Sequence, residues 1–368
     1  MKYNWQLIDW KEFSYNKEDL EDELFRFSEK VGVSKGLYES LSKQLKTDSL
    51  VEIMSDETIN TSAIEGEIFS REDVRSSIHN NLGISSSQVR DKKAQGISDL
   101  IFKVRLDYTT PLSKVELFTW HKLVFPGKSN INAGAWRKGD LPMQIISGSI
   151  GKEIIHYEAP PSAEVNNEMI EFIDWFNSSA PKGKQEIKFA AIRSAIAHLY
   201  FESIHPFEDG NGRIGRAIAE KALFQSLGFP VMVSLSTVLQ SNKSVYYNQL
   251  KKAQRTNQIT EWLNYFIGAL TDALDHSHEL IKFTLFKARF FDKINTQIND
   301  RQRKALYKML STPNKKFEGG MTAKKYMSIN KISKATATRD LQQLEEMNVF
   351  LVEGAGRNTC YQVNKDLE

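Results

Sequence analysis

The chain has 368 residues, of which 40% are hydrophobic and 26% are charged, so it is long enough for two or three globular domains. Its formal net charge of +3 is too small to indicate a polyanionic partner for the whole molecule. The charge is uneven, however. Residues 301–368 contain 13 of the 49 Lys and Arg residues but only 7 of the 46 Asp and Glu residues, so the basic excess lies in this segment.

The composition also restricts the cellular compartment. A single cysteine, Cys360, cannot form an intramolecular disulfide, which is typical of a reducing environment. The opening MKYNWQLIDW has no apolar run after Lys2, so no secretory signal is expected. No stretch reaches the roughly 20 apolar residues that a membrane helix needs. We therefore expect a cytoplasmic protein with no membrane partner.

Apolar residues at spacings of three and four predict that most of the chain is helical. The segment SLVEIMSDETINTSAIEGE is one such helix, and Gly66 is expected to end it, because glycine after a periodic run is a common helix stop. Two further helices are predicted in EIKFAAIRSAIAHLYFESI and RAIAEKALFQSLGF, the second ending at Gly228. A glycine-rich segment separates them.

Two segments break this helical pattern. MQIISGSIGKEIIHYEAPP has β-branched residues on both sides of a Gly/Ser turn, which predicts a β-hairpin. In the tail, RQRKALYKML, TAKKYMSIN and SKATATRDLQQLEEMN predict three helices, and VFLVEGAGRNTCYQV predicts a two-stranded ribbon. Three helices followed by a ribbon is the layout of a winged helix.

The segment HPFEDGNGRIGR, residues 205–216, contains three glycines spaced G-x-G-x-x-G. A Rossmann dinucleotide loop is excluded because that fingerprint follows a strand, whereas a predicted helix precedes this one. No Gly-Lys-Ser/Thr follows, so it is not a Walker A loop. A plain glycine-rich turn between two helices remains an alternative on spacing alone.

The two arginines of this segment argue for an anion site. Arg213 and Arg216 fall in the first turn of the next predicted helix, where the dipole disfavours each cation by a few tenths to about 1 kcal/mol. They also share a face and repel. An anion bound at the free N–H groups of the helix start would relieve both costs. Gly210 and Gly212 would let the backbone approach phosphate oxygens.

An acid and a histidine complete this constellation. A carboxylate beside bound phosphates, here Asp209, is a typical ligand of Mg²⁺. His205 supplies a group that titrates near neutrality. A base, a metal carboxylate and a phosphate cradle together are the parts of a phosphoryl or nucleotidyl transferase.

These residues resemble the Fic family. Its motif HPFx(D/E)GNGRxxR is matched at every specified position, by His205, Pro206, Phe207, Asp209, Gly210, Asn211, Gly212, Arg213 and Arg216. The hairpin resembles the family's flap. The resemblance implies a mainly α fold with three parts: an N-terminal helical region carrying an inhibitory helix (1–95), a Fic helical core with a β-hairpin flap (96–285), and a small C-terminal winged helix-turn-helix domain (286–368).

The resemblance also implies an activity, the transfer of AMP from ATP to a protein hydroxyl with release of pyrophosphate. His205 would be the base that deprotonates a Ser, Thr or Tyr of the target, and Asp209 would hold Mg²⁺. The nucleotide would be bound by the amides of Gly210, Asn211 and Gly212, by Arg213, by Arg216 at the γ-phosphate, and by Asn242 and Tyr246 lining the pocket. The target would pair with the flap, residues 143–158, by β-augmentation.

A second match lies upstream, where TSAIEG fits the family's inhibitory pattern (S/T)xxxE(G/N). Glu65 ends a predicted helix, where the dipole disfavours a carboxylate, so it is expected to need a cation. The resemblance implies that this cation is Arg216. A solvated surface glutamate is the alternative.

Other functions stay open at this stage. Relatives transfer UMP, phosphocholine or phosphate, and some with this glutamate remove AMP. A different class is a DNA-binding regulator that uses the Fic core as a nucleotide sensor. In that case residues 302–364 would bind DNA, with Lys331, Lys334, Thr336, Thr338 and Arg339 at the start of the recognition helix and Arg357 in the wing. The tail could equally dock a protein or form a homodimer.

Overall fold

The computed structural model describes residues 2–127, 130–147, 154–311 and 317–367. The chain divides into two compact units, the first formed by residues 1–40 and 50–278 and the second by residues 41–49 and 279–368. Each unit has a hydrophobic core of its own. In the described part of the chain, no helix is long and apolar enough to cross a membrane.

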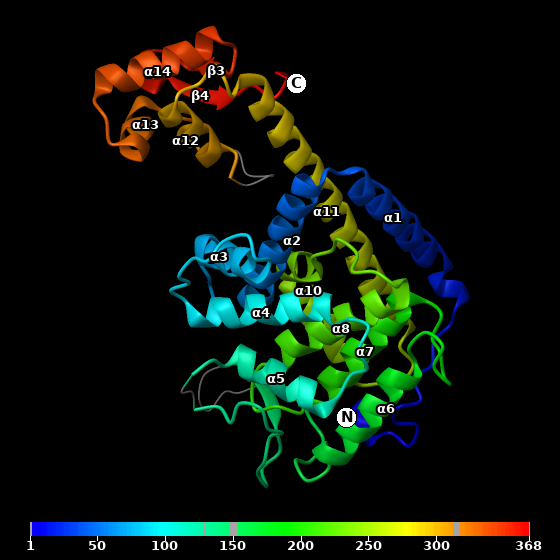
Figure 1. Ribbon diagram of the computed structural model, residues 1–368. Coiled ribbons are helices and arrows are strands. Elements are labelled where there is room, and N and C mark those ends of the chain that lie inside the picture. Colours follow the sequence, from blue (N-terminus) through cyan, green and yellow to red (C-terminus); the bar gives the residue numbers. More distant parts are fainter. Residues whose placement is uncertain (1, 128–129, 148–153, 312–316, 368) are drawn as a thin grey trace. The chain divides into compact units, whose positions relative to one another are not determined.

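The first unit is mainly helical (Figure 1). Its helices are α1 (Glu21–Ser40), α2 (Lys43–Ile64, from residue 50), α3 (Arg71–Asn81), α4 (Lys92–Leu106), α5 (Lys114–Val124), α6 (Val165–Ser178), α7 (Ala190–Ile204), α8 (Asn211–Leu227), α9 (Leu235–Ser241), α10 (Lys243–Ala253) and α11 (Thr260–Ile294, to residue 278). Strands β1 (Gln144–Ser147) and β2 (Ile154–Glu158) form an antiparallel pair. The predicted mainly helical fold with a β-hairpin is confirmed.

Helices α7 and α8 form the centre of this unit. Every residue from Ala191 to Ile204 is buried, as expected for a helix with other elements on all sides. Helix α7 ends where His205 adopts a left-handed conformation, with φ 51°. Helix α8 begins after Gly210, with φ 81°, and ends at Gly228, with φ 78°, as predicted. The glycine-rich segment is therefore the short connection between the two innermost helices.

The predicted hairpin is confirmed by β1 and β2, with a register shift between Ile145 and Ile146. Its turn, residues 148–153, lies outside the described residues. Tyr157 ties the hairpin to the core, because its buried hydroxyl donates to the carbonyl oxygen of Ser203 at 2.6 Å. The hairpin is thus anchored to the last turn of α7.

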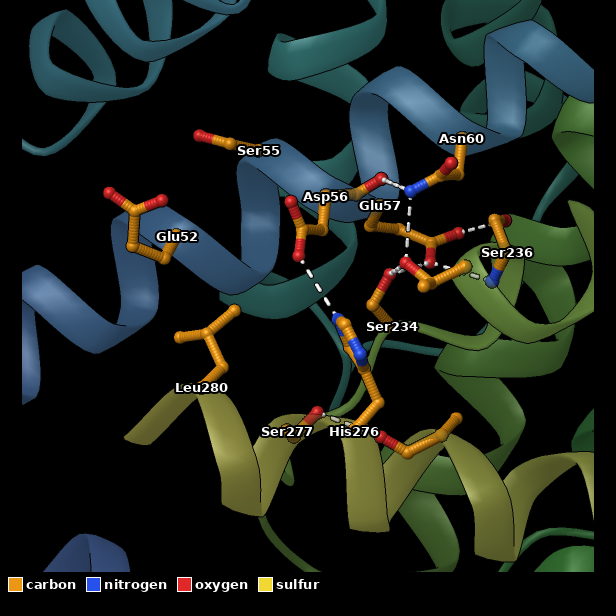
Figure 2. A network of polar contacts seen from close by, with 12 residues as sticks. Glu52, Ser55, Asp56, Glu57, Asn60, Ser234, Ser236, His276, Ser277 and Leu280 are labelled. Atoms are coloured by element: carbon orange, nitrogen blue, oxygen red, sulfur yellow. Dashed lines mark hydrogen bonds and ion pairs between the residues drawn. The ribbon is translucent and has the colours of Figure 1, made fainter. Parts of the chain in front are cut away.

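Helix α2 is tethered to α9 by a buried carboxylate (Figure 2). Glu57 is 2% exposed and accepts hydrogen bonds from Ser234 Oγ at 3.0 Å, from Ser236 N at 2.9 Å and from Ser236 Oγ. One turn later, Asn60 Nδ2 donates to Thr237 Oγ1 at 2.9 Å. A buried carboxylate requires such donors. These contacts fix α2 along its axis and therefore fix the position of its last turn.

The second unit contains the predicted three helices and ribbon. They are α12 (Asp300–Met309), α13 (Ala323–Asn330), α14 (Lys334–Glu346), β3 (Phe350–Glu353) and β4 (Cys360–Val363), and the strands pair antiparallel. Ser333 caps α14 by accepting from Thr336 N at 3.3 Å. The element order agrees with that expected of a winged helix, and the assignment to that class stays a prediction. The side chain of Arg357 lies outside the described part.

Candidate functional site

The connection between α7 and α8 lines a cavity of about 660 Å³. The other walls come from the end of α2, from the flap and from α10. Of the predicted site residues, the structure brings these to the cavity: Glu65, His205, Asp209, Gly210, Asn211, Gly212, Arg216 and Tyr246. Residues far apart in the sequence therefore meet in one pocket.

His205 stands at the end of α7, with its side chain 12% exposed. Its carbonyl oxygen accepts a hydrogen bond from Arg137 Nε at 2.8 Å. Burial, together with the positive charge of Arg137, lowers the pKa of His205 to about 4. The ring is therefore neutral at pH 7, which is the state in which an imidazole can accept a proton.

Arg137 holds the backbone around this histidine and was missed in the sequence. It is 3% exposed, and its Nη2 donates to the carbonyl of Pro160 at 2.6 Å, while its backbone N–H donates to the carbonyl of Pro206 at 2.9 Å. It thus links the segment before β1, the segment after β2 and the end of α7. No local pattern distinguishes it from a surface arginine.

The connection itself is held by side chains of the motif. Asn211 accepts from Phe207 N and donates to Phe207 O, both at 2.9 Å. Phe207 is fully buried and stacks on His121, with ring centroids 4.0 Å apart. His121 Nδ1 accepts from Gly134 N at 2.9 Å, so Nε2 carries the proton that it shares with the carbonyl of Asp209 at 3.1 Å. Phe207 therefore anchors the connection in the core by packing.

The start of α8 faces the segment TSAIEG, residues 61–66. The first intrahelical bond runs from Ile214 N to Gly210 O, so the amides of residues 211–213 are the terminal donors of the helix. A Cβ atom at Gly212 would overlap Glu65 Oε1. The carboxylate of Glu65 therefore already lies where an anion would approach these donors, and glycine is needed for that approach.

Arg216 is bound by both specified polar positions of TSAIEG. Its Nε donates to Thr61 Oγ1 at 2.8 Å, and its Nη2 donates to Glu65 Oε1 at 2.8 Å and to the carbonyl of Thr61 at 2.9 Å. Burial opposes ionisation of Glu65, but the guanidinium outweighs it and lowers the pKa of Glu65. The pair is ionised, and Arg216 is 1% exposed.

A second acid binds the other arginine of the motif. Glu67 Oε2 accepts from Arg213 Nη1 at 2.7 Å, and Lys93 also pairs with Glu67 at 2.7 Å. Arg213 is 3% exposed and is not among the described residues that line the cavity. The role of Arg213 at bound phosphates stays a prediction.

The end of α2 explains why the two acids diverge. Glu67 N donates to Ser62 O and Gly66 N donates to Ala63 O, both at 3.0 Å, and Gly66 has φ 85°. This is a Schellman motif, in which a left-handed glycine ends the helix. It places Glu65 at the end of the helix and Glu67 after the change of chain direction at Gly66. The sequence held a signal for Glu67. It is a second acid only two residues after Glu65, which the resemblance places beside the arginines of the motif.

The predicted metal ligand and the two predicted pocket-lining residues lie in different surroundings. Asp209 has a side chain 59% exposed, and no cluster of three or more His, Cys, Asp or Glu residues occurs in the described segments. Tyr246 is buried, and its hydroxyl bonds to His198 Nε2 at 2.8 Å. Asn242 is not among the described cavity-lining residues; its carbonyl instead accepts from Tyr246 N at 3.2 Å. The geometry therefore gives no support to a nucleotide-binding role for Asn242.

With this geometry established, comparison with known sequences gives the class. Residues 111–223 match the family model described as Fic/DOC family, and residues 3–84 match a domain of unknown function, DUF4172. Residues 111–223 thus form a Fic/DOC family domain, as the motif indicates.

Two curated relatives are similar to parts of the chain. The protein adenylyltransferase Fic of Drosophila willistoni is 23% identical over 215 residues, which are 58% of this chain and 39% of that protein. A probable protein adenylyltransferase of Aquifex aeolicus is 31% identical over 119 residues, which are 32% of this chain and 30% of that protein. The chain thus matches well under half of either relative's length.

Solved structures support the fold. A Fic family protein from Desulfovibrio desulfuricans aligns with a TM-score of 0.53 at 20% identity, covering 93% of this chain and 96% of that one. A Fic domain containing signaling protein from Bacteroides thetaiotaomicron aligns with a TM-score of 0.54 at 18% identity, covering 71% and 97%. The chain has the fold of these Fic proteins.

Proposed function

We propose that the protein transfers AMP from ATP to a hydroxyl side chain of a target protein and releases pyrophosphate. The observation that carries this proposal is the meeting, in one cavity, of a neutral buried His205 with the donor end of α8 and with Arg216. A neutral imidazole accepts the proton of the attacking hydroxyl, and the helix start binds phosphate oxygens. The naming of two relatives as adenylyltransferases supports ATP as the donor.

Each residue has a separate task in this reaction. His205 takes the hydroxyl proton, while the amides of residues 210–212 bind the transferred phosphate. Arg216 binds the γ-phosphate once Glu65 has released it. Arg213 Nε and Arg216 Nη1 have no hydrogen-bond partner among the described residues, so each arginine retains a donor for a phosphate oxygen.

A magnesium ion is compatible with the residues present. Mg²⁺ commonly takes one or two protein carboxylates and completes its shell with substrate phosphates and water. The exposed carboxylate of Asp209, beside the donor end of α8, fits the role of that single protein ligand. When bound, the ion would neutralise charge that develops on the leaving pyrophosphate.

Glu65 holds the protein in an inhibited state in this proposal. Arg216 can pair with Glu65 or with a γ-phosphate, and the carboxylate also faces Gly212, where phosphate would bind. A target protein would dock along the flap, residues 143–158, whose Ile146 and Ile155 are exposed.

The test is mass spectrometry of the Glu65→Gly variant incubated with ATP and a cell lysate. AMP adducts on lysate proteins or on the protein itself support the proposal, and they must vanish in Glu65→Gly/His205→Ala. Two outcomes would contradict AMP transfer. One is adducts of UMP, phosphocholine or phosphate when the matching donors are supplied, and the other is removal of AMP from modified proteins without any transfer.

A DNA-binding function of the second unit is the other candidate. Lys331, just before α14, and Lys334, Thr338 and Arg339 in its first two turns are exposed. The N-terminal end of a recognition helix is the end that enters a DNA groove. Binding of duplex DNA by the whole protein that weakens steeply with salt would support this function.

A further inference from the structure

Glu202 lies beneath His205 and has no part in the reaction as described so far. It is on the last turn of α7, 4% exposed, and its Oε2 lies 3.9 Å from His205 Nδ1. A Cβ atom at Gly215 would overlap Glu202 Oε1, so the carboxyl group fills space that only glycine leaves between α7 and α8. Glu202 Oε1 has no hydrogen-bond partner within the described structure, and the backbone of Glu202 also contacts the His205 ring as an acceptor.

We propose that Glu202 is the positioning residue of the base: its carboxylate accepts the Nδ1–H of His205, leaves Nε2 free to take the target's proton, and stabilises the imidazolium that results. This inference rests on the proposed function, because it assigns a role in that reaction. The separation of 3.9 Å is longer than a hydrogen bond. Catalytic hydrogen bonds are often long before substrate binds.

The proton accounting favours this arrangement. The target's O–H bond breaks and its proton moves to His205 Nε2, while its oxygen bonds to the α-phosphorus of ATP. The bond from that phosphorus to the bridging oxygen breaks, and pyrophosphate leaves with the electron pair. The imidazolium returns the proton to solvent, and Glu202 accepts a hydrogen bond throughout without taking the proton.

The protonation state of Glu202 selects the tautomer of His205. An ionised carboxylate only accepts and so requires Nδ1–H, whereas a protonated carboxyl donates to Nδ1 and puts the imidazole proton on Nε2, where no further proton can be accepted. Burial raises the pKa of Glu202 to about 8, Arg216 opposes the rise and Glu65 adds to it. The inhibitory carboxylate therefore favours the inactive form of the base as well as holding Arg216.

Other groups face this pair. His198 lies one turn before Glu202 on α7, Tyr246 approaches from α10, and Arg137 faces His205 from the segment before the flap. The pKa of His198 is lowered to about 4 by burial, and that of Tyr246 is raised, so both are neutral across pH 6 to 9. Glu202 is therefore the group in this set that titrates within the working range of a general base.

The experiment compares Glu202→Gln, Glu202→Asp and Glu220→Gln, each in the Glu65→Gly background, from pH 6 to 9. Glu220 is the matched control, because it is also a buried glutamic acid with a raised pKa but lies further along α8. We expect Glu202→Gln to lower kcat about 10- to 100-fold, the range for loss of a charge-assisted hydrogen bond, and to change the KM for ATP less than twofold. It should also remove the rise of kcat with pH, which Glu202→Asp should partly restore.

Equal losses of kcat in Glu202→Gln and Glu220→Gln, or an unchanged pH profile in Glu202→Gln, would overturn the proposal. Nitrogen NMR of the His205 ring gives a readout that needs no AMP transfer. In the ATP-bound Glu65→Gly protein at pH 9, Nδ1 should carry the proton, and Glu202→Gln should lower the pKa of His205. If AMP transfer is absent but these NMR shifts occur, the proposed reaction fails and the pairing stands; if the shifts are absent, the pairing fails.

Discussion

Glu67 Oε2 and Arg213 Nη1 lie 2.7 Å apart, so the residue two places after Glu65 binds the first arginine of the Fic motif. We expect Glu67→Gln to raise AMP transfer less than Glu65→Gly does, because the Arg216 pair persists. Combining both changes should exceed either alone. The matched control is Lys93→Gln, which removes the other partner of Glu67 without touching Arg213. A Glu67→Gln rate equal to wild type would show that this pair is structural only.

Glu57 anchors α2 to α9, and its loss should loosen the helix that carries Glu65. Glu57→Ala removes the acceptor of Ser236 N and Ser236 Oγ, at a cost of about 1–3 kcal/mol, whereas Ser234 Oγ keeps its bond to Thr237 Oγ1 at 2.7 Å; the melting temperature should fall and AMP transfer should rise. Ser55→Ala is the control. Ser55 Oγ donates to the carbonyl of Val51 within α2, so this variant removes a buried hydrogen bond without touching the contact to α9. Destabilisation without any gain in transfer would separate this anchor from regulation.

His121 is buried and neutral, and burial lowers its pKa to about 4 from 6.5. As the pH falls from 6.5 to 4, the unfolded chain binds a proton here that the folded protein does not, so this group's contribution to folding stability is lost. The stability of wild type relative to His121→Asn should therefore fall by at most about 1.4 kcal/mol per pH unit in that window. Denaturant unfolding at several pH values measures it. A constant difference would show that His121 protonates freely in the folded state.

The second unit should fold by itself only if its entire core is kept. That core includes Phe290, Phe291, Ile294 and Ile298, all before α12. A fragment of residues 283–368 should unfold cooperatively, whereas a fragment of 301–368 lacks these four apolar side chains and should not. Circular dichroism during thermal unfolding distinguishes them. Cooperative unfolding of the shorter fragment would move the domain boundary to residue 301.

The sequence was most informative where function depends on neighbouring residues. The connection from His205 to Arg216 is contiguous, and Gly66 and Gly228 end helices by local conformational preference. Arg137 was missed because its role arises from hydrogen bonds between distant segments. Glu202 was missed because its role arises from burial on α7, and no local spacing encodes either feature. Asn242 was placed in the pocket by resemblance alone, and its role in binding a nucleotide stays a prediction.

The rate of AMP transfer to the protein itself, measured with labelled ATP in wild type, Glu65→Gly, Glu65→Gly/Arg216→Ala and Glu65→Gly/His205→Ala, tests the central claim most directly. A displacement of reacting groups near 1 Å can cost about 10²-fold, so release of Arg216 from Glu65 should raise the rate at least about tenfold. Arg216→Ala should remove most of that gain, and His205→Ala should abolish transfer while ATP still binds. Equal rates in wild type and Glu65→Gly, with His205 still required, would contradict inhibition by Glu65; full activity without His205 would contradict the mechanism itself.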